Sequence, residues 1–218
     1  MTGKGVFILS KKEYVSYGSC AVGVPGSKEG IAGIRFNLAP MSDNFVDIIL
    51  SSLENVDTSM VWSETDPTST VYRGRESAVF DGVRAVFSQA YHDDIHMSLH
   101  MTISKGCPGD HDADYTLDYD DRRINDRNSR KISFPVVGKF SLYPMGTDNY
   151  MSLIEEVVNN GIDRGVYAGS GHYTTYLKGD VHDVFDYLEY VAERTGKDVS
   201  HYIIEASLLC NLPEGESL

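Results

Sequence analysis

The chain contains two copies of one sequence unit. Shifted by 105 positions (149 − 44), the sequence matches itself without a gap from Asn44 to Pro108. A shift of 104 (140 − 36) aligns the stretch before it, so that RFNLAPM at 35–41 matches KFSLYPM at 139–145. Chance does not keep one register over such a length, and internal repeats decide the fold before any local pattern does. The fold must therefore be built from two copies of one unit.

Within each unit the hydrophobic period changes between strand and helix. IRFNLAPM at 34–41 alternates apolar and polar residues, which predicts a half-buried strand. Ser42 or Asp43, and Thr147 or Asp148 in the second copy, are natural N-caps for the segment that follows. That segment has the apolar spacing of an amphipathic helix, at Val46, Ile49, Leu50 and Leu53.

The rest of the unit predicts two short strands, a second helix and a last strand. SMVWS at 59–63 and STVYR at 69–73 flank a turn at Asp66-Pro67, and a helical pattern covers 79–87. The segment 95–104 alternates strictly and predicts a last strand. This order is the βαββαβ unit of ferredoxin-like folds. We therefore predict an α+β protein of two tandem ferredoxin-like (ACT-like) repeats, with helices on one face of antiparallel sheets and the other face open.

Four segments follow from the repeat. We predict a glycine-rich N-terminal extension over 1–30, a first repeat over 31–110, a charged linker over 111–135 and a second repeat over 136–218. The linker is poor in apolar residues and could hold a hairpin of its own.

Composition and charge narrow the class of protein. The chain of 218 residues is 41% hydrophobic and 23% charged, as ordinary globular proteins are. No apolar run approaches the ~20 residues of a membrane helix, and Val6–Leu9 is too short for a signal peptide. Cys20, Cys107 and Cys210 are odd in number and far apart, so we predict a reducing cytoplasm and no membrane insertion. A net charge of −13 argues against nucleic-acid binding; it serves solubility or favours a cationic small molecule.

The residues expected on the open sheet face are small hydrogen-bonding groups interleaved with aromatic ones. We place Asn37 and Ser141 there from the first strands, Thr70 and Thr175 from the third strands, and we treat the last strand of each unit as a sheet edge. Such a face suits a planar polar ring held at its edges by hydroxyl and backbone groups. An interface between the copies, or between two chains, explains the same pattern. The residues leave both interpretations open.

No catalytic or metal-binding arrangement stands out. His96 and His100 lie on one strand face but about 13 Å apart, too far to share a metal. No nucleophile lies beside a base, and no carboxylate pair stands out. We therefore expect no catalysis, metal or cofactor. An enzyme using His96 or His201 with a nearby acid stays an alternative.

Several phrases together resemble a known family. GIRFNLAPMSDNF, VWSETDPTSTVYRG and ISKGCPGD, with FSLYPM, DNYMSLI and GDVHDVFDYLE in the second copy, are similar to the YkoF family of thiamin- and hydroxymethylpyrimidine-binding proteins. The similarity runs in order from about residue 31 to residue 212. It implies tandem ferredoxin-like repeats related to ACT-type modules, a homodimer, one thiamin or pyrimidine site per repeat, and a link to uptake or salvage of thiamin precursors.

The resemblance also implies ligand-binding positions. Thr70 and Thr175 are expected to contact the aminopyrimidine, followed by the pairs Asn37-Leu38 and Ser141-Leu142 through side chain or backbone. Asp43 and Asp148 either help with a thiazolium charge or act as helix caps. Ala39 stands where the second copy and the family pattern have tyrosine (Tyr143), which predicts a first site that is shallower or tuned differently.

The leading hypothesis is a cytoplasmic, non-catalytic binding protein for thiamin or its hydroxymethyl-aminopyrimidine precursor, acting as a homodimer. The alternative is an ACT-like regulatory module that senses another small metabolite, such as an amino acid.

Overall fold

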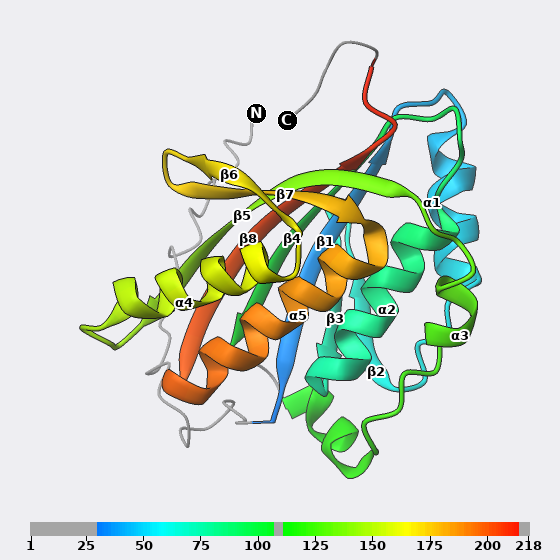
Figure 1. Ribbon diagram of the computed structural model, residues 1–218. Coiled ribbons are helices and arrows are strands. Elements are labelled where there is room, and N and C mark those ends of the chain that lie inside the picture. Colours follow the sequence, from blue (N-terminus) through cyan, green and yellow to red (C-terminus); the bar gives the residue numbers. More distant parts are fainter. Residues whose placement is uncertain (1–29, 107–110, 214–218) are drawn as a thin grey trace, which may run out of the picture.

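All eight strands join in one antiparallel sheet. The computed structural model of the protein describes residues 30–106 and 111–213. The strand order is β2-β3-β1-β4-β8-β5-β7-β6, so the first repeat supplies one half of the sheet and the second repeat supplies the other (Figure 1). Each half follows the predicted βαββαβ order, and the α+β fold with tandem ferredoxin-like repeats is confirmed.

The two repeats match element by element. The first consists of β1 (Ala32–Pro40), α1 (Phe45–Glu54), β2 (Val61–Thr65), β3 (Thr70–Gly74), α2 (Glu76–Gln89) and β4 (Met97–Lys105). The second consists of β5 (Pro135–Met145), α4 (Tyr150–Asp163), β6 (Tyr167–Gly171), β7 (Thr174–Asp180), α5 (Val181–Asp198) and β8 (His201–Cys210). Between them lie a 3-10 helix, η1 (His111–Asp118), and a short helix, α3 (Asp126–Ser129). The described part of the linker thus contains helices and no strand, so the prediction of a hairpin there is wrong.

The last strands of the two repeats pair with each other at the centre of the sheet. β4 and β8 run antiparallel over nine residue pairs, from Met97↔Cys210 to Lys105↔Tyr202. Treating these strands as edges was wrong, because the free edges are β2 and β6. Met101 faces Ala206, and these two residues are equivalent in the repeat (206 − 101 = 105). A local two-fold axis therefore passes through this pair and relates the repeats.

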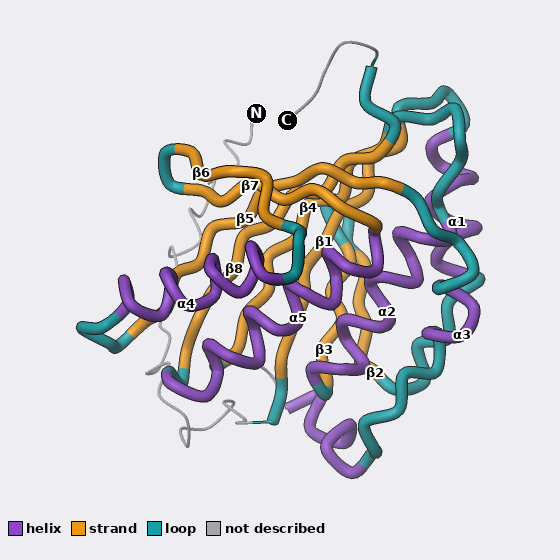
Figure 2. The backbone as a smooth tube through the Cα atoms, in the orientation of Figure 1, coloured by secondary structure: helices purple, strands orange, loops and turns teal. Residues whose placement is uncertain are grey.

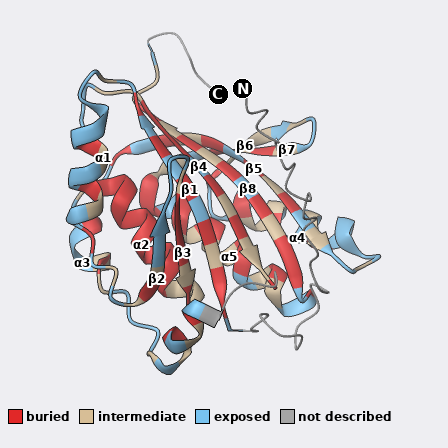
Figure 3. Ribbon diagram, turned by 180° about the vertical axis from the view of Figure 1, so that it is seen from behind, coloured by how far each residue is buried: buried red, intermediate tan, exposed pale blue. Residues whose placement is uncertain are grey.

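Among the described residues, the helices cover one face of the sheet and leave the other face without helices. Figures 1 and 2 show α1, α2, α4 and α5 on the same side, and Figure 3 shows the opposite face with buried and exposed residues alternating along the strands. On β1, Ile34, Phe36 and Leu38 are buried toward the helices, whereas Arg35 and Asn37 are exposed. This alternation is the one that the sequence predicted for the first strand.

Each repeat fills its core with an aromatic pair, but the second ring comes from different elements. In the first repeat Phe36 meets Tyr72 of β3 edge to face, with centroids 5.1 Å apart. In the second repeat Phe140 meets Tyr187 of α5 in the same manner at 5.8 Å. Tyr187 is equivalent to Gly82 (187 − 82 = 105), where a Cβ would lie 3.2 Å from the Tyr72 ring. One bulky ring per site satisfies close packing, whichever element carries it.

The expected helix caps do not form. Asn44 and Asn149 precede the helices, and neither makes a side-chain cap hydrogen bond. The Ser42 and Thr147 hydroxyls instead accept from the backbone N–H groups of Asn44 and Asn149, each at 3.2 Å. These residues shape the turn before the helix. Asp43 and Asp148 are exposed and are not caps.

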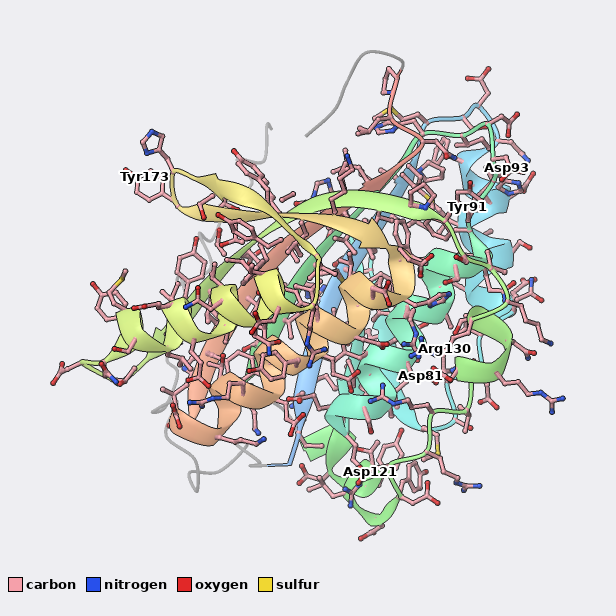
Figure 4. All side chains as sticks on the ribbon, in the orientation of Figure 1. Asp81, Tyr91, Asp93, Asp121, Arg130 and Tyr173 are labelled. Atoms are coloured by element: carbon pink, nitrogen blue, oxygen red, sulfur yellow. The ribbon has the colours of Figure 1, made fainter. Side chains whose placement is uncertain are left out.

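A buried ionic cluster joins the helices of the two repeats. Arg84 of α2 is 1% exposed and donates to Asp186 of α5 at 2.8 Å. It also contacts Asp81, its neighbour on α2, at 3.4 Å, and Asp126 at the start of α3. Arg130 then donates to both Asp126 and Asp186. Figure 4 shows Asp81 and Arg130 in this cluster, between α2 and α3.

The linker completes the interface where the repeat symmetry would leave like charges together. Asp81 and Asp186 are equivalent residues in the repeat. The residue equivalent to Arg84, however, is Glu189, which has the opposite charge. Symmetry would thus set Glu189 against Asp81 on the other side of the axis. The linker supplies Arg123, which donates two hydrogen bonds to Glu189 at 2.8 and 2.7 Å, and Asn125, whose backbone N–H donates to Asp81 at 2.8 Å. The linker is therefore a structural part of the interface between the repeats.

Removing Arg84 should be costly, because the buried Asp81 carboxylate would lose its arginine neighbour and Asp126 and Asp186 would keep only Arg130. We expect Arg84→Met to lower the free energy of unfolding by about 3–5 kcal/mol. Arg122→Met is the control, because Arg122 pairs with Asp120 at the surface and should leave the unfolding midpoint unchanged. Urea unfolding followed by circular dichroism compares the two. Equal midpoints for both variants would show that the cluster does not stabilise the fold.

His182 should make stability depend on pH. Its Nε2 lies 3.0 Å from the Ile132 carbonyl oxygen, whereas Nδ1 is buried without a partner among the described residues. Burial lowers the pKa of His182 below its usual 6.5, against the nearby Asp180 carboxylate. The unfolded chain therefore takes up this proton first, and the free energy of unfolding falls as the pH drops from 7 through the lowered pKa.

The variant His182→Gln should show a smaller loss of stability between pH 7 and pH 5 than the wild type. Other groups that titrate in this range, such as His201, affect both proteins alike, so the difference isolates His182. Denaturant unfolding at a series of pH values measures it. Parallel pH profiles for the two proteins would contradict the assignment.

Candidate functional site

A cavity of about 250 Å³ opens on the helix side of the first repeat, between α1 and the loop that joins β2 to β3. Its volume is slightly below the ~300–1,000 Å³ of pockets for drug-sized ligands, which suits a single small ring system. The cavity is lined by residues of β1, α1, α2 and the β2–β3 hairpin: Phe36, Asn37, Leu38, Ile49, Leu50, Leu53, Thr65, Asp66, Pro67, Thr68, Ser69, Thr70 and Val86.

The lining combines an apolar wall with a group of hydroxyls. Leu50 and Leu53 of α1 face the hairpin across the cavity, and Leu50 is 53% exposed. On the other side the Thr65 and Thr70 hydroxyl oxygens lie 3.0 Å apart. One hydroxyl of such a pair donates to the other and leaves lone pairs and one hydrogen for a ligand. The cavity can thus hold a flat ring between apolar side chains and meet polar atoms on its edge.

The strand backbone beside the cavity is open on one side. β1 pairs with β3 only as far as Phe36↔Thr70, although it pairs with β4 on its other side as far as Pro40↔Met97. In the described part of the chain, no strand therefore lies next to residues 37–40 on the cavity side. Backbone N–H and C=O groups on such an edge are available to a ligand.

The rim of the cavity is a tight loop built around Asp66. The Asp66 Oδ1 atom accepts from the Thr68 backbone N–H at 2.7 Å, from the Thr68 hydroxyl at 2.6 Å and from the Ser69 N–H at 3.0 Å. The Oδ2 atom accepts from Arg35 at 2.7 Å. The hydrogen bonds from Thr68, followed by the one from Arg35, hold the pKa of Asp66 well below its usual value. The loop therefore carries an ionised, fully bonded carboxylate.

The structure brings the three positions expected in the first repeat to one cavity. Thr70 and Leu38 lie on its walls, and both are buried. Placing Thr70 on the open face was wrong, because it pairs with Phe36 and its side chain points to the same helix side. Asn37 also lines the cavity. Strand alternation turns its side chain to the open face, so we infer that its main chain is the part a ligand reaches.

The second repeat has the same plan with different side chains. Thr175 pairs with Phe140 and is buried on the helix side, so its placement on the open face was also wrong. Leu142 is buried, and the Ser141 hydroxyl donates to the Tyr173 carbonyl oxygen at 2.6 Å. Glu155 of α4 stands at the position of Leu50 (155 − 50 = 105). Tyr173, at the tip of the β6–β7 hairpin, is 93% exposed and points outward in Figure 4.

A second cavity, of about 360 Å³, lies near the start of α2 and is lined mainly by charged residues. These charges are largely matched: Arg75 donates to Asp121, Arg123 to Glu189 and Lys197 to Glu193. The Tyr202 hydroxyl donates to Glu76 at 3.1 Å. Because this lining is engaged with itself, the first-repeat cavity is the better candidate for a ligand.

His96 and His201, the two histidines of the enzyme alternative, cannot act together at one site. His96 precedes β4 and His201 begins β8, and these strands run antiparallel, so the two residues lie at opposite ends of the pair, about 30 Å apart. The His96 Nδ1 atom contacts the Cys210 and Asn211 carbonyl oxygens at 2.8 and 3.1 Å, which secures the end of β8.

Residues 30–106 and 111–213 contain no cluster of three or more histidine, cysteine or carboxylate side chains that could hold a metal ion. The helices in these ranges are all too short or too polar to span a bilayer. Cys20 and Cys107 lie outside the described residues, and Cys210 is a buried free thiol.

Comparison with known proteins places the chain in a family. The model of the YKOF-related family matches twice, at residues 31–110 and 136–215. A protein of Bacillus subtilis (strain 168), named "Putative HMP/thiamine-binding protein YkoF", is 39% identical over 183 residues, which cover 84% of this chain and 92% of the relative. The chain belongs to the YkoF-related family. The two matches also coincide with the two repeats of the structure.

Sequence reasoning missed the contribution of the β2–β3 loop and of α1. Asp66, Thr68 and Ser69 form the rim of the cavity, and Leu50 and Leu53 form its outer wall. The phrase DPTST at 66–70 carried a signal, since an aspartate followed by hydroxyl residues in a turn folds onto its own backbone. The phrase does not show on which face of the sheet the loop lies.

Proposed function

We propose that this protein is a non-catalytic, cytoplasmic binding protein for thiamin or its hydroxymethyl-aminopyrimidine precursor, acting in uptake or salvage of thiamin precursors. The observation that carries the proposal is the cavity between α1 and the β2–β3 hairpin, with the Thr65–Thr70 hydroxyl pair on one wall. The name of the Bacillus subtilis relative, which calls it a putative HMP/thiamine-binding protein, supports the choice of ligand.

The chemistry of an aminopyrimidine fits this cavity. The ring presents nitrogen acceptors and an exocyclic amine donor on its edge and two flat apolar faces. Hydroxyls of Thr65 and Thr70 and the open backbone edge near Leu38 offer both donors and acceptors. Side chains such as Leu53 offer apolar contact to the ring faces. We propose Asn37, Leu38 and Thr70 as the contacts in the first repeat, and Ser141, Leu142 and Thr175 in the second.

Loss of one threonine hydroxyl should weaken one site. Thr70→Val keeps the shape of the side chain and leaves a polar edge of the ligand unpaired, which costs about 1–3 kcal/mol. We expect the Kd of the first site to rise roughly 5- to 150-fold. Thr175→Val should do the same at the second site. Calorimetric titration with thiamin and, separately, with hydroxymethyl-aminopyrimidine measures both.

The matched control is Thr102→Val, because the Thr102 hydroxyl lies on the open face and donates to Glu205 at 2.9 Å. It should leave both sites unchanged. A loss of binding in this variant, with none in the other two, would move the site to the open face. Absence of saturable binding by the wild type below millimolar ligand would refute the proposed function itself.

We also propose that two copies associate as a homodimer. The support is the sheet face that the described helices leave uncovered (Figure 3). On it, residues such as Val137, Ile203 and Leu209 are only half buried. Analytical ultracentrifugation should show a species near twice 24.2 kDa. A single 24.2 kDa species at every concentration would rule the dimer out.

A further inference from the structure

Arg35 links the open face of the sheet to the rim of the first cavity. It lies on β1 between the buried residues Ile34 and Phe36, so strand alternation turns it away from the helices. Its guanidinium nevertheless reaches the β2–β3 loop. There it donates to the Asp66 carboxylate at 2.7 Å and to the Ser69 hydroxyl at 2.6 Å.

The two carboxylate oxygens of Asp66 have different hydrogen-bond partners. Oδ1 accepts only from the loop itself, from Thr68 and Ser69. Oδ2 accepts from Arg35, which makes this contact a bond between the loop and β1. The loop could keep its internal turn without Arg35, but it would lose this side-chain connection to the strand that forms the cavity floor. Arg35 thus affects where the rim sits more than how it is folded.

The second repeat fixes its loop by other means. Lys139 and Gly171 stand at the positions of Arg35 and Asp66 (139 − 35 = 104; 171 − 66 = 105), and in the described part of the chain Lys139 forms no ion pair. The Ser141 hydroxyl instead donates to the Tyr173 carbonyl oxygen at 2.6 Å, and the Thr174 hydroxyl donates to the Phe140 carbonyl oxygen at 2.9 Å. Both repeats tie the loop to the first strand, one through an ion pair and the other through uncharged hydroxyls.

We propose that Arg35 is a positioning residue of the first ligand site, which holds the loop over residues 65–70 against β1 and so pre-orders the rim of the cavity. This inference rests on the proposed function, since it concerns the same cavity. A rim that is already ordered costs less conformational entropy when the ligand binds. Because the Arg35 and Asp66 side chains are 50% and 38% exposed, salt weakens their attraction. The affinity of the first site should therefore depend on salt, and that of the second should not.

The experiment uses the single tryptophan of the chain as a reporter of the first repeat. Trp62 lies on β2, which leads into the loop, and no other tryptophan contributes to the fluorescence. The full chain is titrated at pH 8 with hydroxymethyl-aminopyrimidine, which is uncharged there, at low salt and in 1 M NaCl. Calorimetry follows all binding, and a ligand-induced change in Trp62 emission is assigned to the first repeat, which contains this residue. The proteins are the wild type, Arg35→Met, Arg35→Lys and the matched control Lys139→Met.

We expect Arg35→Met to raise the Kd seen by Trp62 about two- to fivefold at low salt, as the loss of one exposed ion pair would. Arg35→Lys should restore part of the affinity, and Lys139→Met should have no effect. In 1 M NaCl the wild type should approach Arg35→Met, whose own Kd should not respond to salt. A residue that only stabilised the fold would lower the unfolding temperature and weaken both sites, independently of salt.

An unchanged Trp62 titration in Arg35→Met would overturn this inference while leaving the proposed function intact. If the wild type shows no binding by either method, the proposed function fails, and this inference fails with it.

Discussion

The pairing of β4 with β8 is the interaction on which the rest of the structure depends. The two strands are the same segment of the repeated unit, and they pair antiparallel so that Met101 meets its own equivalent, Ala206. An antiparallel pair of equivalent strands has a two-fold axis at its centre, so this contact alone sets the relation between the repeats. It places α2 beside α5 and sends both hairpins, β2–β3 and β6–β7, to the far edges of the sheet. The candidate cavity lies at such an edge, where a ligand can enter without disturbing the central pairing.

The two repeats have the same fold, but different side chains fill equivalent positions in their cores, interface and loops. The core ring of the first repeat comes from a strand, at Tyr72, and that of the second comes from a helix, at Tyr187. At the interface, a second arginine opposite Asp81 would complete the symmetry, but Glu189 stands there and the linker provides Arg123. The linker therefore connects the repeats and also neutralises the interface between them. The loops of the two sites differ in the same way, with a charged tie in one and hydroxyl ties in the other.

Much of this architecture could be read from the sequence because it is repeated and periodic. The register of the repeat, the order of elements and the inward residues of β1 and β4 all follow from local spacing. The side of Thr70 did not, because β3 is buried on both faces over Thr70–Tyr72 and shows no alternation. Only its pairing with Phe36 decides the direction of the side chain. The central position of β4 was also hidden, since a strand that alternates looks the same at an edge and in the middle. The role of Arg123 depends on contacts between distant segments, which no local pattern reports.

The central proposal is that the ligand binds on the helix side of the sheet, in the cavity between α1 and the β2–β3 hairpin and at the equivalent positions of the second repeat. Hydrogen–deuterium exchange with and without hydroxymethyl-aminopyrimidine tests it most directly, because it maps protection along the whole chain. We expect slower exchange in α1 and the β2–β3 hairpin, and in α4 and the β6–β7 hairpin, with little change in β4 and β8. Protection concentrated at the start of α2 and around Asp121, with none in the hairpins, would contradict it and move the ligand to the charged cavity between the repeats.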